Sequence, residues 1–203
     1  MVYLRKNKNK IRTGLLSAFK IKKTEIIILI VSSPLGFVNR NENQNTIDII
    51  VMLLNISPEI HVFFKPHPAE DINDFEYLKN ISNRVTVTNS YSVRQLAVFS
   101  RLFITIASSS IIDAIGLNVP VVVYDFTNMN YIDRFAYTKA VKRAFNLDSL
   151  ENTAKDILYN VDARKKIIKV QQNRIKPFAI LDGQCTQRTA SLIHNYINYR
   201  SLN

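Results

Sequence analysis

The sequence predicts an α/β domain in which helices cover both faces of a mainly parallel sheet of five or six strands. Two observations lead to this fold class: short apolar runs recur along the chain, and segments with helical spacing separate them. The runs are apolar on both faces, which is typical of parallel sheets that helices cover on each side. Right-handed crossovers between such strands give a doubly wound arrangement.

Five strands are expected from these runs. EIIILIVS (25–32) is a continuous apolar stretch of strand length, and HVFFK (61–65) is apolar up to its final lysine. RVTVTN (84–89) alternates as a half-buried strand does. LFITIA (102–107) and PVVVYDF (120–126) are again continuous apolar runs, and they complete the set.

Seven helices are expected between and after the strands. The first places apolar residues, including Ile47, Ile50 and Leu54, on one face. The second helix (71–81) opens with an acidic turn, and the third (92–100) is short. The fourth (109–118) begins with a capping-box pattern. The last three follow one another with no strand between them. These helices are expected at 42–57, 71–81, 92–100, 109–118, 149–160, 162–178 and 183–199.

Composition favours one folded domain. The 203 residues suffice for one good-sized domain, and the 47% of hydrophobic residues suffice for its core. The single Cys185 excludes an intramolecular disulfide framework and a cysteine zinc site. No run has the roughly 18 apolar residues of a membrane helix, and no signal peptide is apparent. We therefore expect a cytoplasmic protein, with peripheral attachment to the inner face of the cell membrane as the alternative.

The positive charge is concentrated at the N-terminus. Of 27 basic residues, eight precede the first acid, Glu25, so the remaining 19 face 16 acids. Residues 1–24 are therefore expected to be a basic leader or linker, and 25–203 a single domain. An alternative is a weakly amphipathic helix that lies on an anionic membrane, because four apolar residues recur near helical spacing. These are Ile11, Leu15, Leu16 and Phe19. Nucleic acid is not an expected partner, because no basic surface with interleaved aromatic residues is apparent.

The motif Lys65-Pro66-His67-Pro68 follows the second predicted strand. Each proline keeps the residue before it out of the helical region, so Lys65 and His67 should both be extended. Ligands of open α/β sheets bind at the carboxyl ends of the strands. We expect Lys65 and His67 to lie in a ligand site, and a stiff turn with a solvated histidine is the alternative.

Serines follow the fourth and first predicted strands. Ser108, Ser109 and Ser110 open a helix, and their hydroxyls are candidates for binding phosphate. Ser32 and Ser33, after the first strand, repeat this chemistry more weakly. Asp113 lies three residues after Ser110 and matches a capping box with it, so the alternative role of both is to cap the helix. The fifth strand ends in Tyr124 and Asp125. These two residues either contact the ligand or are ordinary polar residues of a loop.

In their order and placement, these motifs resemble the nucleotide-binding half of GT-B glycosyltransferases. The resemblance is strongest to CDP-glycerol glycerophosphotransferases and to capsule CMP-sugar transferases with HP and SS motifs. It includes GLNVPVVVYD (116–125) and Tyr131, and it covers residues 25–200 in element order. Asp182-Gly183-Gln184 and Thr186-Gln187-Arg188 also resemble an Asp-Gly-Lys-Ala-Ser-Glu-Arg stretch of the former group, with Gln184 and Gln187 replacing its Lys and Glu.

The resemblance implies a Rossmann-like domain that binds a nucleotide-activated donor, CDP- or CMP-linked rather than UDP-linked. His67 would contact the donor phosphates and protonate the leaving group, while Lys65 and Ser108–Ser110 would bind phosphate. No cofactor or metal is expected, because no carboxylate pair with metal-ligand spacing stands near the motifs. The Glu-x7-Glu pattern of retaining GT-B enzymes and the Thr-Glu-Arg-Pro stretch of UDP-sugar 2-epimerases are both absent, which favours an inverting or phosphoglycerol-type transfer.

A GT-B enzyme has two such domains, and the acceptor site usually belongs to the other one. We therefore expect an acceptor-binding domain or partner chain, and no catalysis by this domain alone. The chain could be part of a longer enzyme, a subunit of a split one, or a decayed enzyme. Two alternatives of other classes are a non-catalytic nucleotide-binding or regulatory module and a basic membrane-surface binder.

Overall fold

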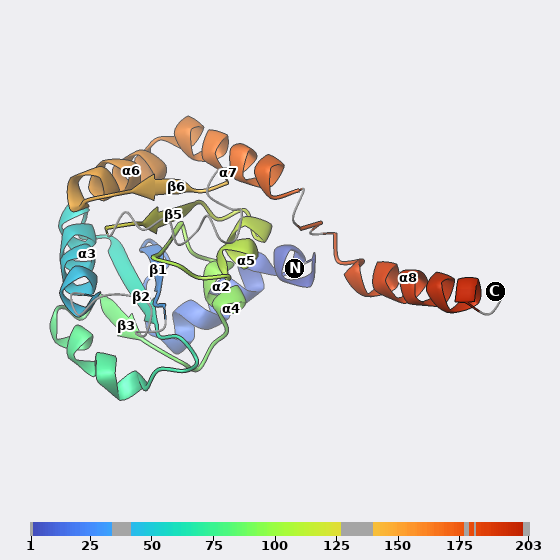
Figure 1. The fold of residues 1–203 in the computed structure, drawn as a ribbon. Coiled ribbons are helices and arrows are strands. Elements are labelled where there is room, and N and C mark those ends of the chain that lie inside the picture. The colour runs from blue at the N-terminus through green and yellow to red at the C-terminus, as the bar shows by residue number, and fades with distance from the viewer. Residues whose placement is uncertain (1, 34–41, 127–139, 177–178, 181, 201–203) are drawn as a thin grey trace.

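The computed structural model describes residues 2–33, 42–126, 140–176, 179–180 and 182–200. Its centre is a six-stranded sheet in the order β3-β2-β1-β4-β5-β6, and every neighbouring pair is parallel (Figure 1). The predicted doubly wound fold is confirmed. The strands are β1 (Ile26–Val31), β2 (Ile60–Lys65), β3 (Val85–Val87), β4 (Leu102–Thr105), β5 (Val121–Tyr124) and β6 (Lys142–Ala144).

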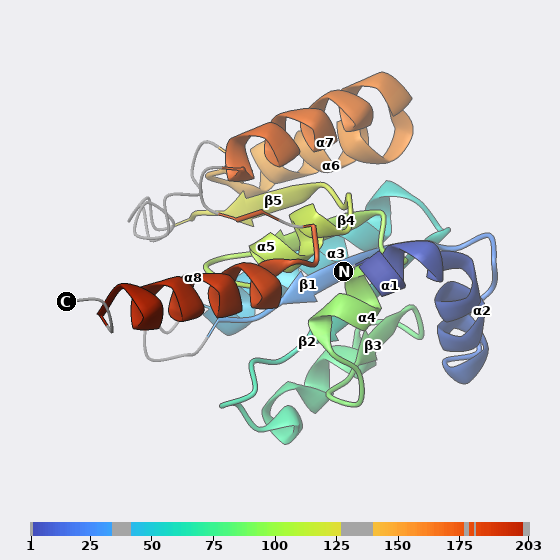
Figure 2. The ribbon, with the colours of Figure 1, turned by 90° about the vertical axis from the view of Figure 1, so that its right-hand side faces the viewer.

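Helices cover both faces of the sheet (Figures 1 and 2). One face packs against α3 (Glu42–Ile56), α6 (Leu147–Tyr159) and the 3-10 helix η2 (Ile72–Asn80). The other packs against α2 (Lys8–Ala18), α4 (Val93–Ala97) and α5 (Ile111–Gly116), while α7 (Val161–Ile175) lies along α5 and α6. The remaining helices are α1 (Val2–Lys6) and α8 (Cys185–Arg200).

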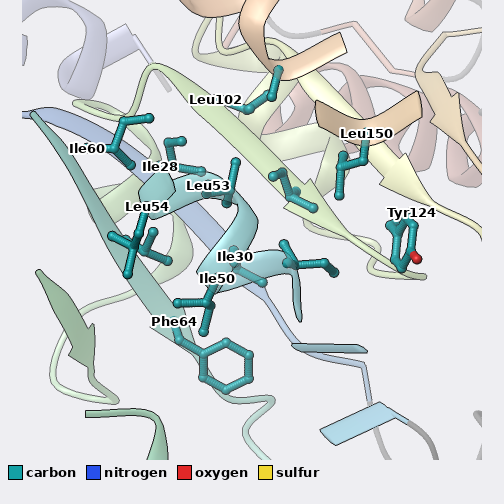
Figure 3. Close-up of a cluster of buried hydrophobic side chains, with 14 of the residues drawn as sticks. Ile28, Ile30, Ile50, Leu53, Leu54, Ile60, Phe64, Leu102, Tyr124 and Leu150 are labelled. Atoms are coloured by element: carbon teal, nitrogen blue, oxygen red, sulfur yellow. The ribbon is translucent and has the colours of Figure 1, made fainter. Parts of the chain in front are cut away.

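Alternation along each strand divides the core between the two faces. In β2, Phe63 belongs to the cluster under α4 and α5, whereas Phe64 belongs to the cluster under α3 and α6. Figure 3 shows part of the second cluster, in which Leu53 of α3 lies beside Ile28 of β1 and Leu150 of α6 lies on the side of Tyr124. Because both faces are buried, the strands read as continuous apolar runs in the sequence.

The topology fixes where a ligand site can lie. β1 has β2 on one side and β4 on the other. From β1 the chain adds β2 and β3 on one side, and it then returns to add β4, β5 and β6 on the other. The carboxyl ends of β1 and β4 therefore flank the switch point of the sheet, where doubly wound domains bind ligands. Three of the polar motifs singled out in the sequence leave β1, β2 and β4 at this edge.

Residues 2–24, within the segment expected to be a leader or linker, pack onto the domain. Leu15 and Leu16 are 5% and 3% exposed and belong to the core cluster with α4 and α5, as does Ile21. The Phe19 ring meets the Phe63 ring edge to face, with centroids 4.9 Å apart. The amphipathic pattern thus serves the core, and Leu15 and Leu16 are covered rather than available to a membrane.

Two elements differ from the sequence expectation. No range was predicted for β6, which is short and has only Ala144 fully buried. The segment expected as a helix at 71–81 is the 3-10 helix η2, whose N-cap Asp71 accepts from the amide of Asn73. Arg143 of β6 pairs with Asp125 at the end of β5, which ties the edge strand to the sheet.

The last helix, α8, projects from the body of the domain in both views (Figures 1 and 2). It presents an apolar stripe at i, i+1, i+4 and i+5, and the four side chains are all more than half exposed. They are Leu192, Ile193, Tyr196 and Ile197. No described helix is both long enough and apolar enough to cross a membrane.

Candidate functional site

A pocket of about 580 Å³ lies at the carboxyl edge of the sheet. It is lined by the ends of β1 and β2 and by the loops that lead into α4 and α5. Six of the residues predicted for the site line this pocket together: Lys65, His67, Ser108, Ser109, Ser110 and Asp113. The shared strand-exit edge thus brings together motifs that lie more than 40 residues apart in the sequence.

Lys65 is the last residue of β2, and its side chain is in the pocket wall. It shares a sheet face with Phe63 and is only 8% exposed, so burial lowers the pKa of its ammonium. Within the described ranges, no acceptor pairs with this ammonium. The stem of this lysine is buried while its ammonium faces the pocket without a partner, and an anionic ligand there would compensate the loss of solvation.

His67 projects from the loop that the two prolines stiffen, and it is partly exposed in the same pocket. Its Nδ1 accepts a hydrogen bond from the amide of Ala69 at 3.1 Å. A ring nitrogen that accepts carries no proton, so the proton of the neutral imidazole is on Nε2. Lys65 and His67 make no hydrogen bond to each other among those described, although both residues line the pocket.

Ser32 and Ser33 hold the loops of the site in place. The amide of His67 donates to Ser32 Oγ at 2.7 Å and to Glu70 Oε2 at 2.8 Å, and the Ser32 hydroxyl donates to the same carboxylate. Ser33 Oγ accepts from the amide of Ala107 at 3.0 Å. Both serines are buried and neither lines the pocket, so their phosphate role stays a prediction, and their visible role is to position the loops.

Ser108, Ser109 and Ser110, in the loop after β4, do not form the capping box predicted for the start of α5. Ser110 has αR backbone angles and makes no side-chain cap, because its hydroxyl lies 2.6 Å from that of Ser108. Asp113 does not reach back to the helix start but accepts from Nε of Arg94 at 2.9 Å. The capping-box prediction is therefore wrong. Ser109 is exposed and its hydroxyl faces no described acceptor, which leaves it available to a ligand.

The loop after β3 also lines the pocket, and the sequence analysis did not predict this part of the site. Arg94, at the second position of α4, brings a second cation to the pocket beside Tyr91 and Ser90. Ser92 caps α4 in a reciprocal box with Gln95, which fixes where the helix begins. The signal was available, because the polar stretch NSYS (89–92) follows a strand that ends at the same edge.

Tyr124 and Asp125, the other predicted donor contacts, do not line the pocket. Tyr124 is 4% exposed within the cluster under α3 and α6, as Figure 3 shows, and burial followed by the charge of Asp48 raises its pKa. Asp125 is buried in an ion pair with Arg143. Tyr131, part of the sequence resemblance, and Pro34, after the serine pair, lie outside the described residues.

The described residues contain no group of three or more His, Cys, Asp or Glu side chains with metal-site geometry. The positive groups of the pocket are therefore side chains of the chain itself, namely Lys65 and Arg94, with the Nε2–H of His67 as a further donor. Together with three serine hydroxyls they form a set of donors suited to phosphate oxygens.

Neither a family model nor a curated protein matches the sequence. Solved structures match by fold. A variant of the wall teichoic acid polymerase TagF soaked with CDPG matches 98% of this chain and 48% of its own at 16% identity, with a TM-score of 0.68. S. aureus MnaA with UDP matches 91% of this chain and 49% of its own at 14% identity, with a TM-score of 0.67. A protein described as a UDP-N-acetylglucosamine 2-epimerase, from Listeria monocytogenes, matches 80% and 44% at 15% identity, with a TM-score of 0.59.

The shared feature at these identities is the fold. The chain has the Rossmann-like α/β fold of these GT-B proteins and spans about half the length of each. A polymerase and an epimerase both match by fold, so the chemistry of the pocket has to distinguish between functions.

Proposed function

We propose that this chain is the donor-nucleotide-binding half of a surface-polysaccharide or teichoic-acid type transferase. It would take a glycosyl or glycerophosphate group from a CDP- or CMP-linked donor, and the acceptor half would lie elsewhere. The observation that carries this proposal is the pocket at the switch point, in which the unpaired, buried Lys65 lies with His67 and Ser108–Ser110. The fold shared with TagF supports the class of donor.

Phosphate fits the donors of the pocket. Lys65 comes from β2, Arg94 from α4, and the serine hydroxyls from the loop before α5, so positive groups and donors surround the same space. Arg94 is paired with Asp113 at a side-chain exposure of 59%, where such a pair contributes little and can yield to a ligand. A volume near 580 Å³ is within the range of pockets that hold a whole small ligand.

His67 would act on the leaving group. In either transfer, the bond between the donor phosphate and the moving group breaks, and its electron pair stays on the phosphate oxygen. The Nε2–H of His67 would donate a hydrogen bond to that oxygen, and Lys65 would stabilise the negative charge that develops there. These groups would supply the positive charge in the metal-independent, inverting transfer that we propose. The proton of the acceptor hydroxyl must go to a base in the other half.

The exposed stripe of α8 supports a missing half. A helix of 16 residues with little tertiary packing is marginal in water, so contact with another surface would stabilise it. TagF matches 98% of this chain, α8 included, and has about as much chain again. We assign the acceptor half, in the same or another polypeptide, as the surface that covers Leu192, Ile193, Tyr196 and Ile197.

Thermal unfolding with nucleotides tests the donor site. CMP, CDP, CDP-glycerol, UDP and UDP-N-acetylglucosamine would each be added to the wild type and to the His67→Ala, Ser108→Ala and Ser33→Ala variants. A true ligand at about 100 times its Kd adds roughly 2.7 kcal/mol of stability. We expect a cytidine-selective shift that His67→Ala and Ser108→Ala lose.

The variant Ser33→Ala serves as the control, because Ser33 lies beside the pocket without lining it. Its stability should fall while the ligand-induced shift persists. A shift that survives in both His67→Ala and Ser108→Ala would refute the assigned site. If cytidine nucleotides bind but the acceptor half restores no transfer in wild type, the non-catalytic nucleotide-binding module is the correct alternative.

A further inference from the structure

A second polar pocket, of about 230 Å³, lies at the opposite, amino edge of the sheet. It is bounded by the residues that begin β1, by the loop before β4 and by α2. Lys8 and Arg12, one helical turn apart on α2, and Arg101, just before β4, bring three cations to its wall. The donor site at the carboxyl edge uses none of them.

The three cations are close enough to repel one another. Partial burial, and then the charges of Arg12 and Arg101, lower the pKa of Lys8. Burial, and then the charge of Arg101, likewise lowers the pKa of Arg164 on α7, so positive charge extends beyond the pocket rim. Such an arrangement costs free energy in the free protein, and an anion would relieve it.

The one acid in the wall, Glu25, is occupied by other partners. Its Oε2 lies 3.0 Å from Nδ1 of His61, and its Oε1 accepts from the amide of Lys22 at 3.3 Å. Arg12 is also committed, because its guanidinium donates to the carbonyls of Phe99, Lys23 and Glu25 and so makes the pocket wall rigid.

Lys8 and Arg101 differ from Arg12 in this respect. Their side chains donate to no acceptor within the part of the chain that the structure describes. A rigid wall, two uncommitted cations and a net positive charge are the conditions for oxyanion binding. The small volume suits one phosphate group and excludes a whole nucleotide.

We propose that this amino-edge pocket binds a single phosphate group, held by Lys8 and Arg101 against the fixed guanidinium of Arg12. The phosphate could belong to free inorganic phosphate or a small phosphomonoester, or to the headgroup of an anionic lipid. The basic N-terminal segment then acts through a folded site that it shares with the loop before β4, and not as a loose charged leader.

The test uses the full chain with inorganic phosphate in calorimetry, and with sedimented vesicles of phosphatidic acid in phosphatidylcholine. Chloride at matched ionic strength controls for salt. The variants are Lys8→Gln and Arg101→Gln, which disturb no described hydrogen bond, and Lys169→Gln on the exposed face of α7 is the charge-matched control. We expect phosphate binding that each of the first two variants weakens roughly tenfold and that Lys169→Gln leaves unchanged.

The two arms distinguish the source of the phosphate. Retention on phosphatidic acid vesicles that needs Arg101 identifies a lipid headgroup, and binding of free phosphate alone identifies a soluble ligand; both outcomes support the site. Phosphate that binds no better than chloride, or equal affinity in all three variants, overturns it. Because CDP binding at the carboxyl edge should be unchanged in Lys8→Gln and Arg101→Gln, failure of this site leaves the proposed function untouched.

Discussion

Replacing Lys65 by methionine is expected to weaken nucleotide binding and to raise stability. Methionine retains most of the length of the apolar stem but removes the ammonium of a residue that is 8% exposed, and this ammonium has no partner among the described residues. If the motif were only a stiff turn, the same substitution would leave ligand binding unaffected. The two readouts therefore move in opposite directions only if the lysine is there for a ligand.

The magnitudes follow from the burial of Lys65. A hydrogen bond to a charged group contributes about 1.5–3 kcal/mol, so its loss should raise the Kd for a nucleotide diphosphate roughly 10- to 150-fold. Replacing an unpartnered charged group of a functional site by an apolar one should add about 0.5–2 kcal/mol to the free energy of unfolding. The stability gain should be smaller than the binding loss, because methionine leaves the pocket wall without a polar group.

The pH dependence gives a further check with a definite sign. Burial lowers the pKa of Lys65 in the folded state below the ordinary 10.5, so between these two values the unfolded chain binds more protons. Wild-type stability should therefore rise with pH through the window that ends near 10.5, by up to about 1.4 kcal/mol per pH unit. The difference between wild type and Lys65→Met should shrink across that window.

Calorimetry with CDP and urea unfolding measure the two effects, and Lys169→Met, an exposed lysine on α7, is the matched control. That control should change neither quantity by more than about 0.5 kcal/mol. A Lys65→Met protein that is less stable than wild type and binds CDP with unchanged affinity would refute the assignment of Lys65 to the site.

Three further predictions address other parts of the molecule. His61 is buried beside Glu25, and burial lowers its pKa, so stability should fall by up to about 1.4 kcal/mol per pH unit below 6.5; urea unfolding of wild type against His61→Gln checks this. Ser33→Ala leaves the amide of Ala107 unpaired and should cost about 1–3 kcal/mol, whereas Ser109→Ala should change unfolding by less than about 0.5 kcal/mol but weaken CDP binding. In hydrogen exchange, α8 amides of the isolated chain should exchange fast, and protection that grows with protein concentration would show that a second copy covers the stripe.

The fold could be predicted from the sequence because most strands are apolar runs of strand length, and both properties indicate strands buried inside a parallel sheet. β1, β2, β4 and β5 are buried on both faces, so their apolar runs needed no knowledge of their neighbours. β6 could not be found in this way, since Lys142 and Arg143 are polar and its pairing depends on β5 lying beside it. In the N-terminal segment the charges dominate the composition, while a few apolar residues, including Leu15, Leu16 and Ile21, pack against the core.

The site was predictable only as far as topology determines it. Placing polar residues at strand exits correctly brings Lys65, His67 and the serines after β4 to one pocket. It cannot tell a hydroxyl that faces the pocket from one that turns inward, which is why Ser33 was grouped with Ser109. The direction of each side chain depends on partners from other loops, such as the amide of Ala107, and those distances are not in the sequence.

These cross-loop hydrogen bonds bear on what the chain would do without the proposed acceptor half. Ser32 and Glu70 hold the amide of His67, and Ser33 holds the loop before α5, so three strand exits are fixed to one another before any ligand arrives. Little ordering free energy is then left for the ligand to supply, and the donor site should be competent to bind without the acceptor half. Catalysis differs, because the base for the acceptor hydroxyl and the exclusion of water depend on a second surface. Binding without turnover is therefore the behaviour that this geometry predicts for the chain on its own.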